Sequence, residues 1–331
     1  MRILQDQEFH TLEHLLKLNQ ETLRKTMAAY LRTKYKKVED TKDYVIAHGD
    51  IPIALVAHMD TVFFKIPEEL FYDTAKNVMW SPTGAGFDDR AGIYAILQIV
   101  KQGLRPHIIL TTDEEVGALG ASVLATRACP FKDLRYLIQL DRRGSNDCVF
   151  YDCDNPDFVK YVEGFGFVEA YGTFSDISTI CPAWKIAGVN LSIGYRDEHT
   201  ASETLFVGNM LATIDKVITM LQATDIPSFK YVPLPYLYDE RWLQSYYRNR
   251  YGWEYDEVAC ASCRRLYLPE EMIPVIGKDN HTKYFCPDCV VDKVVWCTKC
   301  GTAHEGSSKS GVINGCICCP KEGVIPNNAD N

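Results

Sequence analysis

The 331-residue sequence has no long apolar run, no excess of basic charge and no signal sequence. None of its hydrophobic segments approaches the roughly 20 residues that cross a bilayer, which argues against a membrane-spanning protein. The net charge of −9 argues against general nucleic-acid binding, because that function needs a basic surface. The N-terminus lacks a basic region followed by an apolar stretch and a cleavage site, so we expect a cytoplasmic protein.

Cysteine is scarce in the first 250 residues and concentrated after them. Four of the 13 cysteines (Cys129, Cys148, Cys153 and Cys181) come first, and the other nine lie between residues 260 and 319. The later cysteines come in CxxC pairs, whereas a secreted disulfide framework would not. Metal binding is therefore the better explanation of the cysteine-rich region.

Hydrophobic periodicity predicts an α/β domain with a mixed, mostly parallel central sheet and helices on both faces. Runs of Ile, Leu and Val, such as IPIALVA before His58, are typical of strands buried in a parallel sheet. Apolar residues between these runs recur at helical spacing. Helices are predicted over residues 5–36 (one or two), 91–101, 117–127, around 157–163 and over 204–223, and further strands at 44–48 and 148–151.

The sequence divides into an α/β domain over residues 1–225, a connector over 226–256 and a cysteine-rich region over 257–331. The connector is rich in proline, which suggests a linker, but also in Tyr and Trp, which are rarely left in water. We therefore expect the connector to pack against the first domain or against a partner.

Five potential metal ligands follow one another in a fixed order along the first domain. Most of them end or closely follow a predicted strand, and the carboxyl ends of parallel strands meet at one edge of a sheet. Each residue alone reads as a solvated strand end, an acid at a helix N-terminus or a surface histidine. Together they provide the bridging carboxylate and the further ligands that two metal ions need. The five are His58, Asp88, Glu115, Asp141 and His199.

Two further acids stand beside these ligands. Asp60 lies on the same strand face as His58, so it can hydrogen-bond the imidazole nitrogen that does not bind metal. Glu114 precedes Glu115, and a hydrolase would use one carboxylate as ligand and its neighbour as a base. The pattern predicts a two-metal hydrolase.

The motifs HMD, GFDDRAG, DEEVG, QLD and EHT, in this order, resemble those of the co-catalytic di-zinc exopeptidases. That superfamily contains peptidase T-like tripeptidases and the leucyl and glutamyl aminopeptidase-like enzymes, and the resemblance covers residues 5–223. It implies two active-site zinc ions, with cobalt or manganese as alternatives. It further implies that Asp88 bridges the ions, His58 and Asp141 complete one, Glu115 and His199 complete the other, Asp60 orients His58, and Glu114 is the general base.

The chain departs from two branches of this superfamily. Only 58 positions separate Asp141 from His199, and only 28 separate Asp60 from Asp88, so neither gap holds the inserted domain of those branches. We expect a bare catalytic domain, as in the leucyl aminopeptidase-like branch. Three residues near the ligands read as exposed loop residues rather than substrate contacts, and Asp176 resembles a family segment near the site. The three are Arg142, Arg143 and Tyr195.

The C-terminal region predicts two structural zinc ribbons, because each CxxC pair supplies two thiolates to a tetrahedral ion. A region of this size with few aliphatic residues can hardly fold without metal. Cys318 can replace Cys319, His304 can replace a thiol, and interleaved pairing of the four CxxC pairs is an alternative. The predicted ligands are Cys260, Cys263, Cys286 and Cys289 for one zinc ion, and Cys297, Cys300, Cys316 and Cys319 for the other.

The main hypothesis is an aminopeptidase or dipeptidase that hydrolyses short peptides and carries about two structural zinc ions in its tail. One alternative is an amidohydrolase that removes an acyl group from a non-peptide amine. Another is a catalytically vestigial adaptor whose zinc ribbons dock a protein. The tail carries more acidic than basic residues, which favours a protein partner over nucleic acid.

Overall fold

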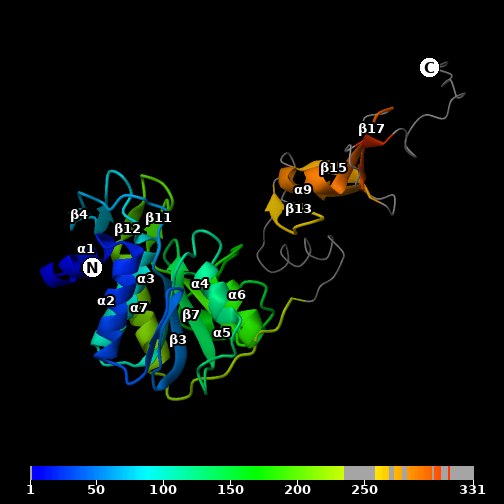
Figure 1. Cartoon of the computed structure of the whole chain (residues 1–331). Helices are drawn as coiled ribbons and strands as arrows, with labels where there is room; N and C mark the ends of the chain where they lie inside the picture. Colours follow the sequence, from blue (N-terminus) through cyan, green and yellow to red (C-terminus); the bar gives the residue numbers. More distant parts are fainter. Residues whose placement is uncertain are drawn as a thin grey trace, which may run out of the picture. The chain divides into compact units, whose positions relative to one another are not determined.

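The computed structural model describes residues 2–234, 258–267, 272–277, 282–299, 302–306 and 312–313. The chain forms two compact units, Met1–Tyr236 and Leu237–Asn331 (Figure 1). Residues 226–234 of the expected connector pack on the first unit, where the rings of Phe229 and Phe158 lie 4.6 Å apart and Pro233 bridges to Cys153. The rest of the expected connector lies outside the described residues.

An eight-stranded sheet forms the centre of the first unit, in the order β1-β2-β6-β3-β7-β10-β8-β9. Its middle is parallel, because β3 pairs with β6 and β7, and β7 pairs with β10. Strands β2 and β8 join antiparallel, so the expected mixed, mostly parallel sheet is confirmed. The strands are β1 (Val38–Asp40), β2 (Tyr44–Ala47), β3 (Ile51–His58), β6 (Pro106–Thr111), β7 (Tyr136–Arg142), β8 (Asp147–Val149), β9 (Val168–Glu169) and β10 (Gly188–Ser192).

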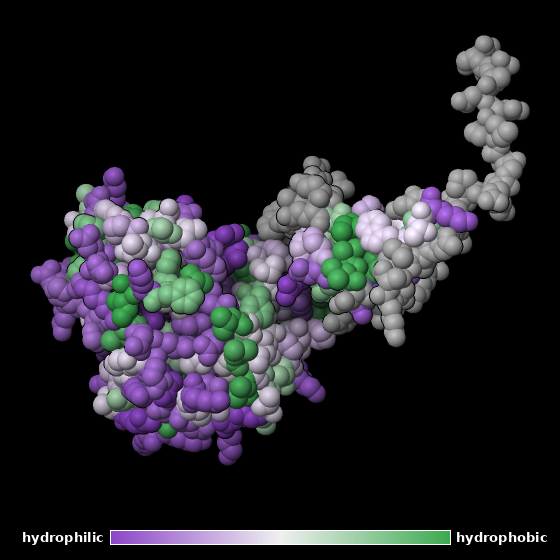
Figure 2. Space-filling view, turned by 45° about the horizontal axis from the view of Figure 1, so that its top comes forward, coloured by the Kyte–Doolittle hydropathy of each residue, from purple (hydrophilic) through white to green (hydrophobic). Residues whose placement is uncertain are grey.

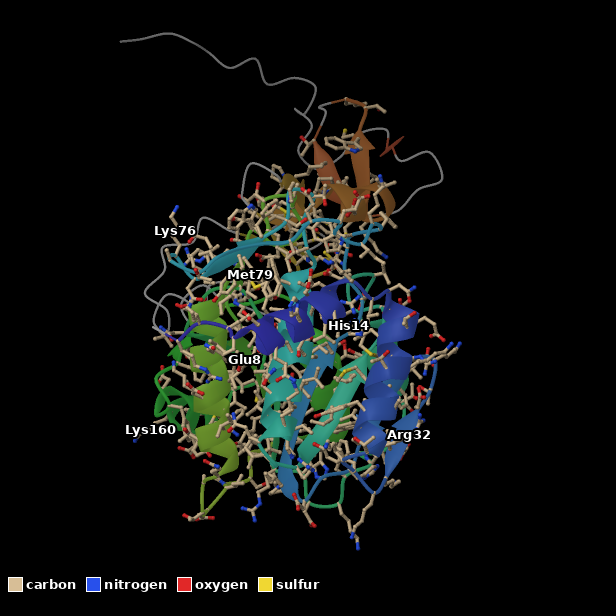
Figure 3. The ribbon with its side chains drawn as sticks, turned by 90° about the vertical axis from the view of Figure 1, so that its left-hand side faces the viewer. Glu8, His14, Arg32, Lys76, Met79 and Lys160 are labelled. Carbon is tan, nitrogen blue, oxygen red and sulfur yellow. The ribbon has the colours of Figure 1, made fainter. Side chains whose placement is uncertain are left out.

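Helices cover both faces of this sheet. On one face lie α1 (Asp6–Leu16), α2 (Gln20–Arg32), α3 (Phe87–Lys101) and α7 (Val207–Leu221), and in Figure 3 α1 crosses in front of the more upright helices. Buried residues of α5 (Pro156–Glu163) belong to the same core. On the other face, α4 (Leu119–Ala125) and α6 (Asp176–Trp184) pack over a smaller core. Each predicted helix has a counterpart in the structure, although not always with the predicted bounds, whereas α6 was not predicted.

The first helices begin where their sequence caps them. Gln5 and Glu8 form a reciprocal capping box at the start of α1, and the Asn19 side chain accepts a hydrogen bond from Thr22 N at the start of α2. Their apolar faces bury residues such as Leu12 and Leu23 in the core. The predicted segment 5–36 is therefore two amphipathic helices.

A second, four-stranded sheet carries one of the ligand segments. Its order is β11-β12-β5-β4, with β11 (Tyr195–Arg196), β12 (Thr204–Phe206), β5 (Val78–Trp80) and β4 (Phe71–Asp73). The predicted helix over 204–223 is wrong at its start, since the β-favouring Thr-Leu-Phe sequence forms β12 and the helix begins at Val207. His199 therefore lies between two strands of this sheet rather than at the end of a central strand.

Strand alternation explains where the polar side chains gather. In β3, Ala54 and Val56 face the core beneath α4 and α6, so His58 points to the same side. In β7, Leu137 faces that core, and Asp141 follows it at even spacing. Toward their carboxyl ends, the strands thus turn from apolar to ionisable side chains on the α4–α6 face.

The second unit is smaller and rich in short strands. A two-stranded and a five-stranded sheet are present among its described residues. No helix in the described parts of the chain is long and apolar enough to cross a membrane. On the face shown in Figure 2, hydrophilic side chains predominate and the apolar ones form separate patches. The elements of this unit are β13 (Val258–Ala259), β14 (Leu266–Tyr267), β15 (Ile273–Ile276), β16 (Thr282–Phe285), α9 (Pro287–Lys293), β17 (Val294–Cys297), β18 (Ala303–Glu305) and β19 (Val312–Ile313).

Candidate metal centre

His58 stands at the centre of a group of carboxylates. Its side chain is 1% exposed, and its Nε2 lies 3.1 Å from Asp88 Oδ1 and 3.6 Å from Asp141 Oδ1. Ligand atoms of these three residues all lie within 4.8 Å of one another, which is close enough to hold one ion. One of the two predicted sets of ligands is therefore assembled at the carboxyl ends of β3 and β7 and the start of α3.

The second set shares Asp88 with the first. His199 Nε2 lies 3.2 Å from Asp88 Oδ2 and 3.0 Å from Glu115 Oε2. Ligand atoms of these three residues again lie within 4.8 Å of one another. The two oxygens of Asp88 thus face different histidines.

Asp60 joins the first ligand to the acidic loop. Its Oδ1 lies 3.2 Å from His58 Nδ1, on the side of the ring away from Asp88. The same carboxylate accepts hydrogen bonds from Glu114 N at 3.0 Å and from Glu115 N at 2.9 Å. Asp60 therefore orients the imidazole and fixes the backbone of the residues expected to serve as base and ligand.

Asp141 is held by neutral side chains. Its Oδ1 accepts a hydrogen bond from the Tyr195 hydroxyl at 2.9 Å. Its Oδ2 accepts from Gln139 Nε2 and from Ser175 Oγ, both at 3.0 Å. The Asn190 side chain binds the backbone of Asp141 at both its N–H and its carbonyl oxygen. This network fixes the carboxylate and keeps the side chain on the α4–α6 face.

Two buried acids that sequence reasoning did not assign to the site also belong to it. Asp89 accepts hydrogen bonds from His58 N at 3.3 Å and from Gly92 N at 3.0 Å. Glu203, which is 0% exposed, accepts three hydrogen bonds from the backbone of residues 85–88. The only sequence signal for Glu203 is its position four residues after His199, which by itself reads as a surface acid before the predicted helix over 204–223.

The carboxyl groups of the centre lie so close together that their ionisation is opposed by burial and by one another's negative charge. Burial raises the pKa of Glu114 to about 9, and Asp141 and Asp176 act in the same direction. Burial also raises the pKa of Glu115 to about 7. Hydrogen bonding to Asp88 raises the pKa of His199 to about 9, since the carboxylate favours the charged imidazole. These raised pKa values show that the site favours additional positive charge, which bound cations would supply.

Paired divalent cations fit this arrangement. Imidazole nitrogens and carboxylate oxygens are the usual donors to catalytic zinc, and carboxylates also suit manganese. Glu115 Oε1 is buried and has no hydrogen-bond partner among the described residues, so an acceptor is left for a ligand. His58 and His199 approach opposite oxygens of Asp88, which leaves one carboxylate between the two groups.

The other candidates from the sequence have different positions. Tyr195 is 3% exposed and hydrogen-bonds Asp141, so the expectation of an exposed loop residue is wrong for it. Arg143 is exposed and forms an ion pair with Glu198 at 3.1 Å. Arg142 is partly buried and ends β7, so the expectation of an exposed loop residue is wrong for it too. Asp176 is 0% exposed, accepts a hydrogen bond from Thr111 Oγ1 and lies close enough to Glu114 to raise the pKa of that acid.

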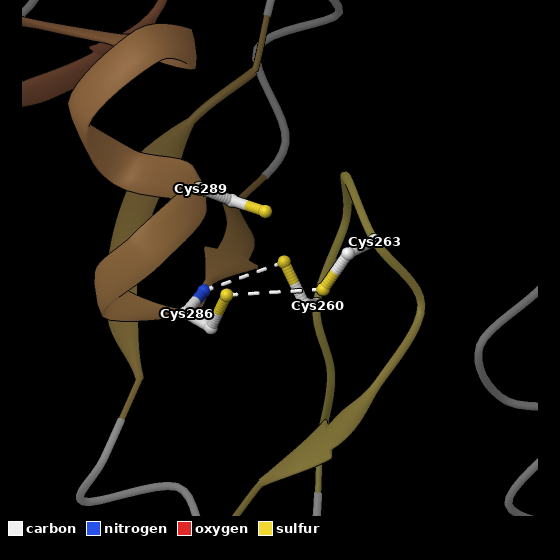
Figure 4. A group of neighbouring side chains, drawn as sticks. All are labelled: Cys260, Cys263, Cys286 and Cys289. Carbon is white, nitrogen blue, oxygen red and sulfur yellow. Dashed lines mark hydrogen bonds between the residues drawn. The ribbon is translucent and has the colours of Figure 1, made fainter. Parts of the chain in front are cut away.

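Four cysteines of the second unit form a separate cluster. Ligand atoms of these cysteines lie within 4.8 Å of one another, with Cys263 Sγ 3.8 Å from Cys286 Sγ (Figure 4). Cys260 Sγ accepts a hydrogen bond from Cys286 N at 3.4 Å. The β13–β14 hairpin carries Cys260 and Cys263, while the start of α9 carries Cys286 and Cys289.

The second expected cysteine set is only partly described. Cys297 is buried at the end of β17, whereas Cys300, Cys316, Cys318 and Cys319 lie outside the described residues. His304, the alternative ligand, is 8% exposed, and its Nε2 has no hydrogen-bond partner among the described residues. The second ribbon therefore stays a prediction.

Comparisons with protein families and with curated proteins found no match to the chain. Several solved structures are similar to it. A tripeptidase from Staphylococcus aureus Mu50 is 14% identical, with 65% of this chain and 97% of that chain covered and a TM-score of 0.51. An aminopeptidase from Desulfurococcus kamchatkensis is 15% identical over 66% of this chain and 95% of that chain, with a TM-score of 0.52.

A third similar structure is a TET aminopeptidase from the archaeon Thaumarchaeota SCGC AB-539-E09. It is 14% identical over 67% of this chain and 98% of that chain, with a TM-score of 0.53. At these identities the likeness establishes the fold. The first unit has the fold of tripeptidases and aminopeptidases, as its resemblance to the co-catalytic exopeptidases implied.

Proposed function

We propose that the first unit is a metal-dependent aminopeptidase that hydrolyses short peptides. The observation that carries this proposal is the pair of ligand sets that share Asp88, one with His58 and Asp141 and the other with Glu115 and His199. The proteins of similar fold support the peptide as substrate, since they are described as a tripeptidase and aminopeptidases.

Different residues of the centre have different roles in the proposed reaction. When bound to the two ligand sets, divalent ions would polarise the scissile carbonyl and make the attacking water more acidic. Glu114 would accept a proton from the attacking water as its oxygen bonds to the carbonyl carbon, and would give the proton to the amine as the C–N bond breaks. Asp60 fixes the position of the Glu114 backbone, because it accepts hydrogen bonds from the N–H groups of residues 114 and 115.

The same geometry supports different roles for the two neighbouring acids. Glu115 Oε2 lies 3.0 Å from His199, so this carboxylate belongs to the second ligand set. Glu114 precedes it and is not part of either set. Only one of the two neighbouring acids is therefore occupied by metal binding, and the other is left to carry a proton.

The test is a peptide digestion assay with the metal-loaded full chain. Mass spectrometry of a mixture of short peptides should show residues removed from the N-terminus. Glu114→Gln should lower kcat by about 10²- to 10⁴-fold, the usual contribution of general acid–base catalysis. Glu163→Gln, at an exposed glutamate on α5, is the matched control and should have no effect.

The outcomes separate the competing functions. Cleavage of N-acyl amines without cleavage of peptides would replace the proposal with a deacylase. Equal rates for wild type and Glu114→Gln would remove Glu114 as the base. A His58→Ala, His199→Ala double variant should hold two fewer ions than wild type by elemental analysis, and an unchanged metal content would refute the two-metal centre.

We also propose that the cluster of Cys260, Cys263, Cys286 and Cys289 holds one structural zinc ion. Four thiolates without a free position match a closed, non-catalytic site. The cluster ties the β13–β14 hairpin to α9, which have few apolar residues to hold them together. Metal removal should therefore unfold this part of the second unit, and hydrogen exchange with and without a chelator measures it.

A further inference from the structure

Glu203 is a buried acid that binds no side chain of the metal centre. Its Oε2 accepts hydrogen bonds from Gly86 N at 2.6 Å and from Ala85 N at 3.1 Å, and its Oε1 accepts from Asp88 N at 3.0 Å. The residue is 0% exposed. One carboxylate thus satisfies three backbone donors in the loop that delivers Asp88.

The segment that carries Glu203 also carries His199. Thr200 Oγ1 donates to Asp197 O at 2.7 Å, and Ser202 N donates to Thr200 Oγ1 at 3.2 Å. Glu203 N donates to Thr200 O at 3.1 Å, which closes the turn. His199 is therefore part of a compact folded loop whose last residue is Glu203.

The end of this loop is held by the four-stranded sheet. Directly after Glu203, β12 pairs with β5, with Leu205 opposite the buried Met79, which Figure 3 labels. The loop before Asp88 is equally confined, because a Cβ on Gly86 would lie 2.7 Å from Thr61 Oγ1. Since both segments are held, the three hydrogen bonds to Glu203 link two fixed parts of the chain.

We propose that Glu203 is a positioning residue that sets the spacing between Asp88 and His199. It thereby determines the affinity of the ion held by Asp88, Glu115 and His199. This inference rests on the proposed two-metal function. It predicts that the other ion, held by His58 and Asp141 together with Asp88, depends less on Glu203, because the strands β3 and β7 fix those two ligands.

A carboxylate is needed because all three groups that face it are donors. The amide introduced by Glu203→Gln would present one acceptor oxygen and one N–H₂ group, so at least one backbone N–H would meet another donor. The loop would then shift Asp88 relative to His199. Replacing a residue that orients a metal ligand typically weakens metal binding by about 10- to 100-fold.

The experiment titrates Mn²⁺ into the chelator-treated full chain with zinc restored to the cysteines. Manganese prefers carboxylate oxygens over thiolates, so it reports on the first unit rather than on the cysteine cluster. Calorimetry gives the two dissociation constants. Electron paramagnetic resonance gives an independent signature, because two Mn²⁺ ions about 3.5–4 Å apart couple magnetically.

For Glu203→Gln we expect the second ion to bind at least about 10-fold more weakly and the first ion to be weakened much less, with loss of the coupled signal at equal Mn²⁺. Thr213→Val is the matched control for stability, because it deletes a buried hydrogen bond from Thr213 Oγ1 to Ser192 O at 2.7 Å. It should lower Tm while leaving both dissociation constants unchanged.

Three results overturn the inference. Unchanged dissociation constants in Glu203→Gln, together with a lower Tm, would make Glu203 a purely structural residue. Equal weakening of both ions would refute its selective action on the second one. Failure of the wild type to bind a pair of Mn²⁺ ions would overturn the proposed function itself. If Glu203→Gln does not fold, Glu203→Asp keeps the charge with a shorter reach, and it should still weaken the second ion.

Discussion

Replacing Glu115 by glutamine is expected to stabilise the metal-free protein and to abolish its stabilisation by metal. Burial raises the pKa of Glu115 from 4.5 to about 7, and the Asp88 carboxylate acts in the same direction. An acid with a raised pKa contributes stability that is present below pH 4.5 and is lost as the pH rises through about 7. The Glu115→Gln variant should not lose this stability as the pH rises, because an amide does not ionise.

The size of the effect follows from that pKa. A rise of about 2.5 in pKa corresponds to about 3 kcal/mol, at roughly 1.4 kcal/mol for each pKa unit. Because Glu115 is only partly buried, solvent screens part of this energy, and we expect about 2 kcal/mol at pH 8. Near pH 4.5 the two proteins should be about equally stable.

Urea unfolding of the chelator-treated full chain at pH 5 and pH 8 measures the difference between wild type and Glu115→Gln. The second unit is identical in both proteins, so its unfolding cancels in the comparison. Added Mn²⁺ at about 100 times the dissociation constant should stabilise the wild type by about 2.7 kcal/mol and the variant by much less. A variant that is no more stable than wild type at pH 8 would refute the idea that burial and neighbouring negative charge oppose the ionisation of Glu115.

Three other changes test separate parts of the structure. Tyr195→Phe deletes a hydrogen bond to a metal-ligand carboxylate, and Mn²⁺ calorimetry should show binding of one ion weakened by about 10-fold. Cys260→Ser should lower the zinc content by one ion per chain in elemental analysis, while Cys129→Ser, outside the cluster, should leave it unchanged. Gly84→Ala places a Cβ 2.2 Å from a phenylalanine ring at φ +80°, whereas Gly103→Ala at φ +91° meets nothing within 4 Å among the described residues. Both should lower Tm through backbone strain of about 1–3 kcal/mol, and Gly84→Ala should lower it further.

The sequence predicted the structure best where a long apolar strand ends at a potential metal ligand. The strands before His58 and Asp141 are long apolar runs, so their ends were predictable and the two side chains fall on the same face. Helix α6 was missed because its residues include Ile, Thr, Cys and an internal Pro182, which do not favour a helix. Tertiary contacts with α4 and the sheet override that local preference.

The acids of the centre show a second limit. From the sequence they are interpreted as ligands, a base, an acid that orients His58 or surface residues, according to their neighbours along the chain. In the structure, Asp60, Asp89 and Glu203 accept hydrogen bonds from backbone N–H groups, in the case of Asp60 in addition to its contact with His58. Every non-proline residue carries the same backbone N–H, so no residue type marks the donor end of these contacts.

These three acids explain how loops can hold a metal centre in place. Asp60 fixes the backbone of residues 114 and 115, Asp89 fixes the end of β3 at His58, and Glu203 fixes the loop that ends at Asp88. Each of these three acids thus constrains the backbone of a predicted metal ligand. Ligands whose backbones are fixed lose little conformational entropy when ions bind, so the free energy of binding is not consumed in ordering the loops. If this is correct, deleting any one of the three should weaken metal binding more than it lowers the stability of the metal-free fold.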